Sequence, residues 1–191
     1  LPAGTRFAVQ PEALGTGHAV LCALPEIRRA EADVLVVWGS QPLLSSATLA
    51  RSIMVHQALG SAAMLFPTAV TRTPYAPIQR DLHGYVVASL ETAREGAATK
   101  RLGETNVGAF VLGADMLREA LPRLHDTLWD AAARRYTTRS GELGFPNAMA
   151  RALVSAGRAV IALPIASPEE GYGLRDRAGF NEVKGVLRGR A

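Results

Sequence analysis

A continuous apolar run at residues 33–38 constrains the fold of this chain more than any other feature. The run reads Asp-Val-Leu-Val-Val-Trp and stops at Gly39 and Ser40. Short apolar runs that end in turn residues are typical of strands buried on both faces of a parallel sheet. Apolar residues at helical spacing precede the run within residues 17–30, and residues 46–59 form a second helical pattern behind a serine cap. The run therefore predicts a central parallel strand between two helices.

Segments typical of strands and helices continue to alternate along the rest of the chain. Strands are predicted at residues 84–90, 105–112 and 159–164, helices at residues 114–123 and 148–155, and a short helix or extended arm at residues 180–187. This alternation is typical of an α/β fold with a mostly parallel sheet, in which ligands bind beyond the C-terminal ends of the strands. Because the length suits one core and no linker interrupts it, we expect residues 1–191 to form a single domain.

Composition narrows the class of protein and the compartment. No apolar run approaches the roughly 20 residues that span a bilayer, and the first residues lack a signal-peptide pattern, so we expect no membrane association. Because the only cysteine, Cys22, cannot form an internal disulfide, a reducing compartment such as the cytoplasm is expected. A formal charge of +4 suits anionic partners, but scattered basic residues and 6% aromatics argue against nucleic acid.

The most specific motif occupies residues 10–19, Gln-Pro-Glu-Ala-Leu-Gly-Thr-Gly-His-Ala. It resembles the base-binding segment of N-acetylglucosamine-1-phosphate uridyltransferases, within the sugar-1-phosphate nucleotidyltransferase family. A glutamine amide offers both a donor and an acceptor to a pyrimidine edge, and glycine permits close approach of a flat base. The resemblance implies that Gln10, Gly15 and Thr16 contact the nucleotide.

Residues 35–43 resemble the strand of that family which ends in Gly-Asp-x-Pro-Leu. The resemblance implies that Trp38 and Gly39 lie at the nucleotide. In the family the aspartate helps to bind the magnesium ion that bridges the phosphates, whereas this chain has Ser40 at that position. Magnesium strongly prefers a charged oxygen ligand to a neutral hydroxyl, so this substitution bears directly on catalysis.

Three further segments resemble the sugar-binding side of the family. Residues 74–81 resemble its Gly-Tyr-Gly-Arg-Ile loop and the strand that follows, which implies that Tyr75 and Ala76 lie at the sugar. Ala76 replaces a glycine and is expected to narrow the pocket. Glu91 matches a glutamate that receives sugar hydroxyls, and Asn106 matches the asparagine of a Glu-Ile-Asn-Thr-Gly motif that hydrogen-bonds the amino sugar.

The resemblance also implies a cofactor and an architecture. Residues 179–182 resemble a Gly-Val-Asn-Asn segment, which implies that Asn181 is a second protein ligand of Mg²⁺. The implied architecture is a Rossmann-like nucleotidyltransferase fold with a mostly parallel central sheet. The family's first strand and its glycine-rich phosphate loop have no counterpart here, because residues 1–6 are similar to that loop only superficially. We therefore expect a partner chain or a missing segment to complete the sheet.

Three hypotheses about function remain open at this stage, and no catalytic residue is assigned. The first is an enzyme that makes UDP-N-acetylglucosamine from UTP and N-acetylglucosamine 1-phosphate, a sugar 1-phosphate, with Mg²⁺ neutralising the phosphate charge. The second is a catalytically degenerate domain that binds a nucleotide sugar or serves as a scaffold, which Ser40 and the altered loop at Tyr75 favour. The third is a portion of a longer protein whose other strands complete the sheet.

Overall fold

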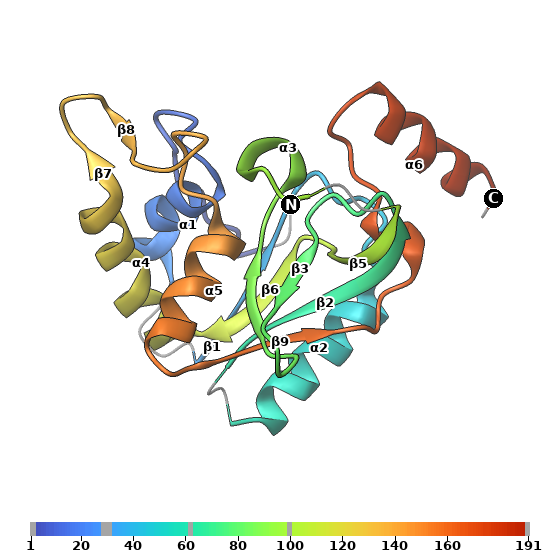
Figure 1. Cartoon of the computed structure of the whole chain (residues 1–191), viewed down its shortest axis with the longest axis horizontal. Coiled ribbons are helices and arrows are strands. Elements are labelled where there is room, and N and C mark those ends of the chain that lie inside the picture. The colour runs from blue at the N-terminus through green and yellow to red at the C-terminus, as the bar shows by residue number, and fades with distance from the viewer. Residues whose placement is uncertain (1–2, 28–31, 61–62, 99–100, 190–191) are drawn as a thin grey trace.

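The computed structural model describes residues 3–27, 32–60, 63–98 and 101–189, which fold around one five-stranded sheet (Figure 1). The strands of this sheet are β1 (Asp33–Val37), β2 (Ala63–Arg72), β5 (Leu102–Asn106), β6 (Ala109–Gly113) and β9 (Ala159–Leu163). They follow the order β1-β6-β2-β5, and β9 pairs with β2. Two small two-stranded sheets are formed by β3 (Ile78–Arg80) with β4 (Val86–Ser89) and by β7 (Trp129–Asp130) with β8 (Arg135–Tyr136).

The sheet is mixed in direction. β6 runs antiparallel to both β1 and β2, so β1 and β2 point the same way, and β9 is parallel to β2 while β5 is antiparallel to it. The predicted α/β class is confirmed. The prediction of a central parallel strand at residues 33–38 is wrong for the described sheet, because β1 lies at its end and pairs only with β6, to which it is antiparallel. The prediction that this strand is buried on both faces is wrong as well, because β1 is only partly buried and Val37 is exposed. An apolar run does not identify the neighbouring strand.

A second correction concerns residues 105–112, which were predicted as one strand and instead contribute to two. β5 ends at Asn106 and β6 begins at Ala109, with Gly108 between them at φ 78°. That left-handed conformation breaks the extended backbone, and glycine adopts it without the steric cost that a side chain adds. The amide of Gly108 donates to the Asn106 side-chain oxygen over 3.1 Å, which fixes the break in place.

Helices cover both faces of the sheet. They are α1 (Thr16–Ala23), α2 (Ser46–Ala58), α3 (Thr92–Glu95), α4 (Ala114–Leu128), α5 (Phe145–Ser155) and α6 (Arg177–Gly189), with 3-10 turns at Leu24–Glu26 and Pro168–Gly171. Residues of α1, α4 and α5 pack with Val34 and Val36 of β1 in the main core. Asp33 faces α2 instead, 3.5 Å from His56, because successive strand residues point to opposite faces.

The predicted helices and the predicted terminal element are present with shifted ends. The first helix was predicted over residues 17–30, of which residues 28–30 lie outside the described part of the chain. The terminal segment is a helix, α6, which is longer than predicted and projects from the body at the C-terminal end (Figure 1). None of the helices in the described ranges has the length and apolar character needed to cross a membrane.

Aromatic packing in the core fixes the C-terminal end of β1. The fully buried Phe110 ring of β6 makes edge contacts with Phe66 at 5.8 Å, Phe145 at 5.6 Å and Trp38 at 5.5 Å. Edge-to-face pairs at this spacing are favourable beyond the area that they bury. Trp38 directly follows β1, so the core positions the turn at Gly39 and Ser40.

Candidate functional site

The predicted base-binding segment is a tight loop that leads into α1. The side-chain amide of Gln10 donates to the Gly15 carbonyl over 3.0 Å and lies 3.1 Å from Nδ1 of His18. Gly15 has φ 100°, and a Cβ there would lie 2.6 Å from the carbonyl oxygen of Leu143. The position therefore requires glycine for its backbone conformation and for space. These contacts hold the Gln10 side chain against the loop that contains the motif.

The same loop is fixed to the start of α5. The Thr16 hydroxyl accepts from the amide of Phe145 over 2.9 Å, and the amide of Gly17 donates to the Leu143 carbonyl over 2.7 Å. Thr16 thus occupies the N-terminus of α1 and braces it against the first turn of α5. The sequence motif therefore forms a rigid structural unit with residues 143–145.

A half-buried carboxylate, that of Glu95, connects α5 to the predicted sugar side. Glu95 accepts from the Asn147 amide over 3.0 Å and from the backbone amide of Glu91 over 2.8 Å. Burial raises the pKa of Glu95, and the hydrogen bonds from Glu91 and Asn147 partly offset that effect. Glu95 fixes the backbone at Glu91, which sequence reasoning had singled out, although Glu95 itself was not predicted.

The turn after β1 contains the predicted nucleotide residues Trp38 and Gly39. The amide of Trp38 donates to the Gly108 carbonyl over 2.8 Å, and Gly39 is solvent-exposed. The indole Nε1 of Trp38 is buried and has no hydrogen-bond partner among the described residues. A buried N–H without a partner is uncommon in folded proteins and is energetically unfavourable.

Tyr75 and Glu91, which were singled out separately in the sequence, contact each other in the structure. The Tyr75 hydroxyl donates to the Glu91 carboxylate over 2.5 Å, although the two residues are far apart in sequence. Ala76 is fully buried, and its amide donates to the Thr105 hydroxyl over 3.0 Å. Tyr75 and Glu91 are half-buried and lie nearer the surface than Ala76, which belongs to the packed interior.

Asn106 is buried and satisfied inside the protein. It is 2% exposed, its amide nitrogen donates to the Ser89 hydroxyl over 2.5 Å, and its oxygen accepts from Gly108. Asn106 therefore joins β4, β5 and the start of β6. This arrangement gives the residue a structural role beside the sugar-binding role that the resemblance implies.

Asn106→Ala is expected to lower the free energy of unfolding by about 1–3 kcal/mol, because the substitution leaves buried groups at Ser89 and Gly108 without a partner. Urea denaturation measures this change. Asn181→Ala is the matched control, since Asn181 is exposed on α6 and such substitutions usually change stability by less than about 0.5 kcal/mol. Equal effects of the two substitutions would contradict the structural role of Asn106.

The two residues implied as magnesium positions have different surroundings. Asn181 is an exposed residue of α6. Ser40 lies beside a different segment, residues 172–175, because its carbonyl accepts from the amide of Leu174 over 2.8 Å. The assignment of Asn181 to the metal stays a prediction, and the structure offers Arg175 as the neighbour of the Ser40 turn.

Arg175 is a partly buried cation between the two sides of the site. Its guanidinium carbon stands 3.7 Å from the centre of the Tyr75 ring. Gln41 is 5% exposed, and its side-chain amide is assigned the orientation that satisfies both of its neighbours. In that orientation its oxygen accepts from the Arg175 guanidinium and its nitrogen donates to the Tyr172 carbonyl over 2.8 Å. Burial lowers the pKa of Arg175, and the nearby Tyr75 and Glu91 counteract that effect.

These side chains do not fit a magnesium ion. Ser40 supplies a neutral hydroxyl, and its neighbour Arg175 supplies a positive charge that repels a dication. Within the described ranges, no group of three or more His, Cys, Asp or Glu residues is arranged to hold a metal. The Mg²⁺ requirement implied by the resemblance therefore stays a prediction, without a donor set in the described residues to support it.

Arg175 was missed by the reading of the sequence, although a signal for it exists. The pair Gly173-Leu174 matches the Gly-Val start of the family's Gly-Val-Asn-Asn segment as well as Gly179-Phe180 does. The two readings differ by six residues, and only tertiary structure distinguishes them. The first pair lies at the Ser40 turn in the structure, because the amide of Leu174 donates to the Ser40 carbonyl.

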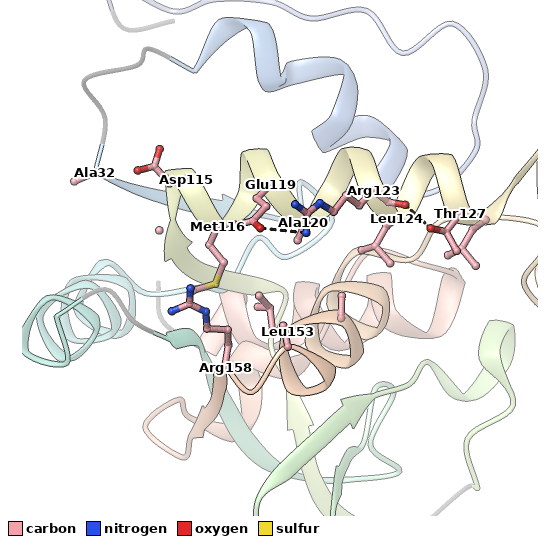
Figure 2. Close-up of a pocket in the computed structure, with 14 residues that line it drawn as sticks. Ala32, Asp115, Met116, Glu119, Ala120, Arg123, Leu124, Thr127, Leu153 and Arg158 are labelled. Atoms are coloured by element: carbon pink, nitrogen blue, oxygen red, sulfur yellow. Dashed lines mark hydrogen bonds and ion pairs between the residues drawn. The ribbon is translucent and has the colours of Figure 1, made fainter.

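Two cavities in the described part of the chain differ in the residues that line them. The wall of a 220 Å³ cavity includes Tyr75, the cations Arg72 and Arg175, and the acidic residues Asp176 and Glu182. A larger cavity of 650 Å³ lies between α4 and α5, and its lining in Figure 2 includes Met116 and Leu153. Charged side chains of this larger cavity are at its rim, where Arg123 pairs with Glu119 of the same helix over 3.2 Å. None of the predicted site residues lines the larger cavity, and of them Tyr75 alone is in the lining of the smaller one. We therefore place the sugar side of the candidate site at the smaller cavity.

Comparison with known proteins confirms the resemblance found in the sequence. The chain is 35% identical over 187 residues to the bifunctional protein GlmU of Geotalea uraniireducens and 34% identical over 187 residues to GlmU of Pelotomaculum thermopropionicum. Each match covers 97% of this chain. The chain is a relative of one part of GlmU. It spans 38% of the length of these relatives, and no protein-family model matches it.

Solved structures agree on the fold. HddC from Yersinia pseudotuberculosis superimposes with a TM-score of 0.57 at 14% identity, covering 93% of this chain and 64% of that one. A nucleoside-diphosphate-sugar pyrophosphorylase from Vibrio cholerae gives a TM-score of 0.59 at 13% identity, covering 94% of this chain and 67% of that one. At these identities the likeness establishes the fold alone, which is that of nucleotidyltransferase-type sugar pyrophosphorylases. The chain is thus a nucleotidyltransferase-like domain of the GlmU type.

Proposed function

We propose that this domain binds a uridine nucleotide sugar, with UDP-N-acetylglucosamine as the ligand. The base is assigned to the loop of Gln10, Gly15 and Thr16 and to the turn of Trp38 and Gly39. The sugar is assigned to Tyr75, Glu91 and Asn106, with Ala76 in the floor of the pocket. These roles are carried over from the sequence resemblance to N-acetylglucosamine-1-phosphate uridyltransferases.

The observation that carries the proposal is the continuity of contacts between the two sets of residues. The base-side loop is hydrogen-bonded to the start of α5 at Phe145, and Asn147 of the same helix is bonded to Glu95. Glu95 in turn holds Glu91, which accepts from Tyr75. A ligand that reaches from base to sugar needs such a fixed relation between its two subsites, because preorganisation reduces the entropy cost of binding.

A second candidate is transfer of a uridyl group from UTP to N-acetylglucosamine 1-phosphate. The 35% identity to GlmU over nearly the whole chain favours it. The Ser40 turn argues against it for residues 1–191 alone, because Ser40 itself supplies a hydroxyl where the family has a metal-binding aspartate. Magnesium-dependent release of pyrophosphate from the two substrates would establish this activity.

Ligand-induced stabilisation tests the proposed binding. UDP-N-acetylglucosamine present at about 100 times its dissociation constant should raise the free energy of unfolding by about 2.7 kcal/mol. Thermal denaturation at increasing ligand concentration measures the effect, and uridine diphosphate and free N-acetylglucosamine separate the contributions of the two subsites. A melting temperature that does not respond to the nucleotide sugar would refute the proposal.

We also propose that a further strand pairs with the open edge of β1, from a partner chain or from a segment outside residues 1–191. In the described part of the chain β1 pairs on one side only, and an unpaired strand edge favours association. Sedimentation velocity tests the idea. A strictly monomeric and soluble chain at high concentration would argue against it. A cytoplasmic location remains a prediction from the single Cys22.

A further inference from the structure

The turn at Ser40 is held by a short segment that presents a cation to the candidate site. Leu174 is bonded through its amide to Ser40, and the next residue, Arg175, donates to Gln41. Asp176 immediately precedes α6, and its carboxylate accepts from the amide of Gly179 in the first turn over 2.8 Å. The Arg175 side chain is therefore fixed by the turn after β1 on one side and by the start of α6 on the other.

The surroundings of Arg175 leave it positioned for an anionic ligand. The face of its guanidinium group lies on the Tyr75 ring, and Tyr75 is bonded to Glu91. Asp176 and Glu91 are the acidic residues whose charges act on Arg175, and neither forms an ion pair with it within the described contacts. A guanidinium group has five N–H donors in a planar fork, and the contact with Gln41 uses only part of them.

We infer that Arg175 binds the phosphate groups of the nucleotide sugar directly, at the place where related sites would use a metal ion. This inference rests on the proposed function and specifies how the same site neutralises its ligand. Ser40 cannot offer a carboxylate to a metal, and Arg175 beside it supplies positive charge without one. Arginine pairs with phosphate oxygens through two parallel hydrogen bonds, so it provides both charge and orientation.

The test compares the wild-type chain with Arg175→Met, Arg175→Lys and Arg177→Met by calorimetric titration with UDP-N-acetylglucosamine and with uridine. Methionine keeps an apolar side chain on Tyr75 but removes the charge, while lysine retains the charge without the planar fork. Arg177 is an exposed residue at the start of α6 and serves as the matched control. Each titration is run with a chelator and again with Mg²⁺.

Arg175→Met is expected to lower the affinity for UDP-N-acetylglucosamine by about 10- to 100-fold, which corresponds to the loss of charge-assisted hydrogen bonds. The affinity for uridine should stay unchanged. Arg175→Lys should retain part of the affinity that Arg175→Met loses, and Arg177→Met should bind like the wild type. The chelator should not lower the affinity of the wild-type chain. If the role of Arg175 is only structural, Arg175→Met will lower the affinity for both ligands equally, and that result would overturn the inference. Wild-type binding that requires Mg²⁺ would also overturn it while leaving the proposed function intact, whereas no binding at all would refute both.

Discussion

Gly108→Ala is expected to lower the free energy of unfolding by about 2–6 kcal/mol, from backbone strain and overpacking together. Gly108 has φ 78°, and a Cβ there would lie 2.6 Å from the Trp38 ring and 2.7 Å from the Gln41 side chain. Both neighbours are in or beside the turn that contains Ser40. The substitution should therefore reduce nucleotide-sugar binding as well as stability, which urea denaturation and ligand titration measure separately.

Gly84→Ala isolates the packing contribution to this effect. Gly84 has a similar left-handed backbone at φ 86°, but a Cβ there would meet nothing within 4 Å. Gly84→Ala should therefore lower the free energy of unfolding by about 1–3 kcal/mol, from backbone strain alone. If Gly84→Ala and Gly108→Ala lower the free energy of unfolding equally, the close packing of the Trp38 turn against Gly108 does not contribute to the effect of Gly108→Ala.

Gly179→Ala is expected to displace the segment that contains Arg175. A Cβ at Gly179 would overlap the carbonyl oxygen of Gly173, two residues before Arg175. Because the obstacle is backbone rather than a flexible side chain, α6 or the segment must move, at a cost of about 1–3 kcal/mol. We expect the affinity for UDP-N-acetylglucosamine to fall by about tenfold or more as Arg175 moves away.

The same helix provides the control for this prediction. Gly185 also lies in α6, and a Cβ there would be in open space. Gly185→Ala should therefore stabilise the protein by about 0.5–1 kcal/mol, because alanine has the higher helix propensity, and should leave ligand affinity unchanged. Weaker binding by both variants would mean that α6 as a whole, rather than the contact at Gly173, controls the site.

Local sequence patterns predicted where the helices and strands lie along the chain better than they predicted which elements pack beside one another. The apolar run of β1 and the capped pattern of α2 were located to within about a residue, because burial and capping leave direct traces in sequence. The edge position of β1 could not be predicted, since strand order depends on contacts between distant segments. The break between β5 and β6 was visible only as Gly108 inside an apolar stretch.

The sequence predicted which residues belong to the candidate site better than it predicted the contacts between them. Tyr75 and Glu91 were singled out separately, and the structure adds the hydrogen bond that joins them. Asn106 was predicted as a ligand-contacting residue, but its burial and its bonds to Ser89 and Gly108 depend on three strands meeting. Arg175 was overlooked because a lone arginine in a charged terminal segment resembles solvated surface until its contact with Gln41 is known.

The most direct test of the account is a calorimetric titration of UDP-N-acetylglucosamine into the purified, folded chain in the presence of a metal chelator. The account predicts saturable binding to one site per chain, with an affinity that added Mg²⁺ does not increase. No heat of binding from a sample with an intact cooperative unfolding transition would contradict it, as would binding that appears only after Mg²⁺ is supplied.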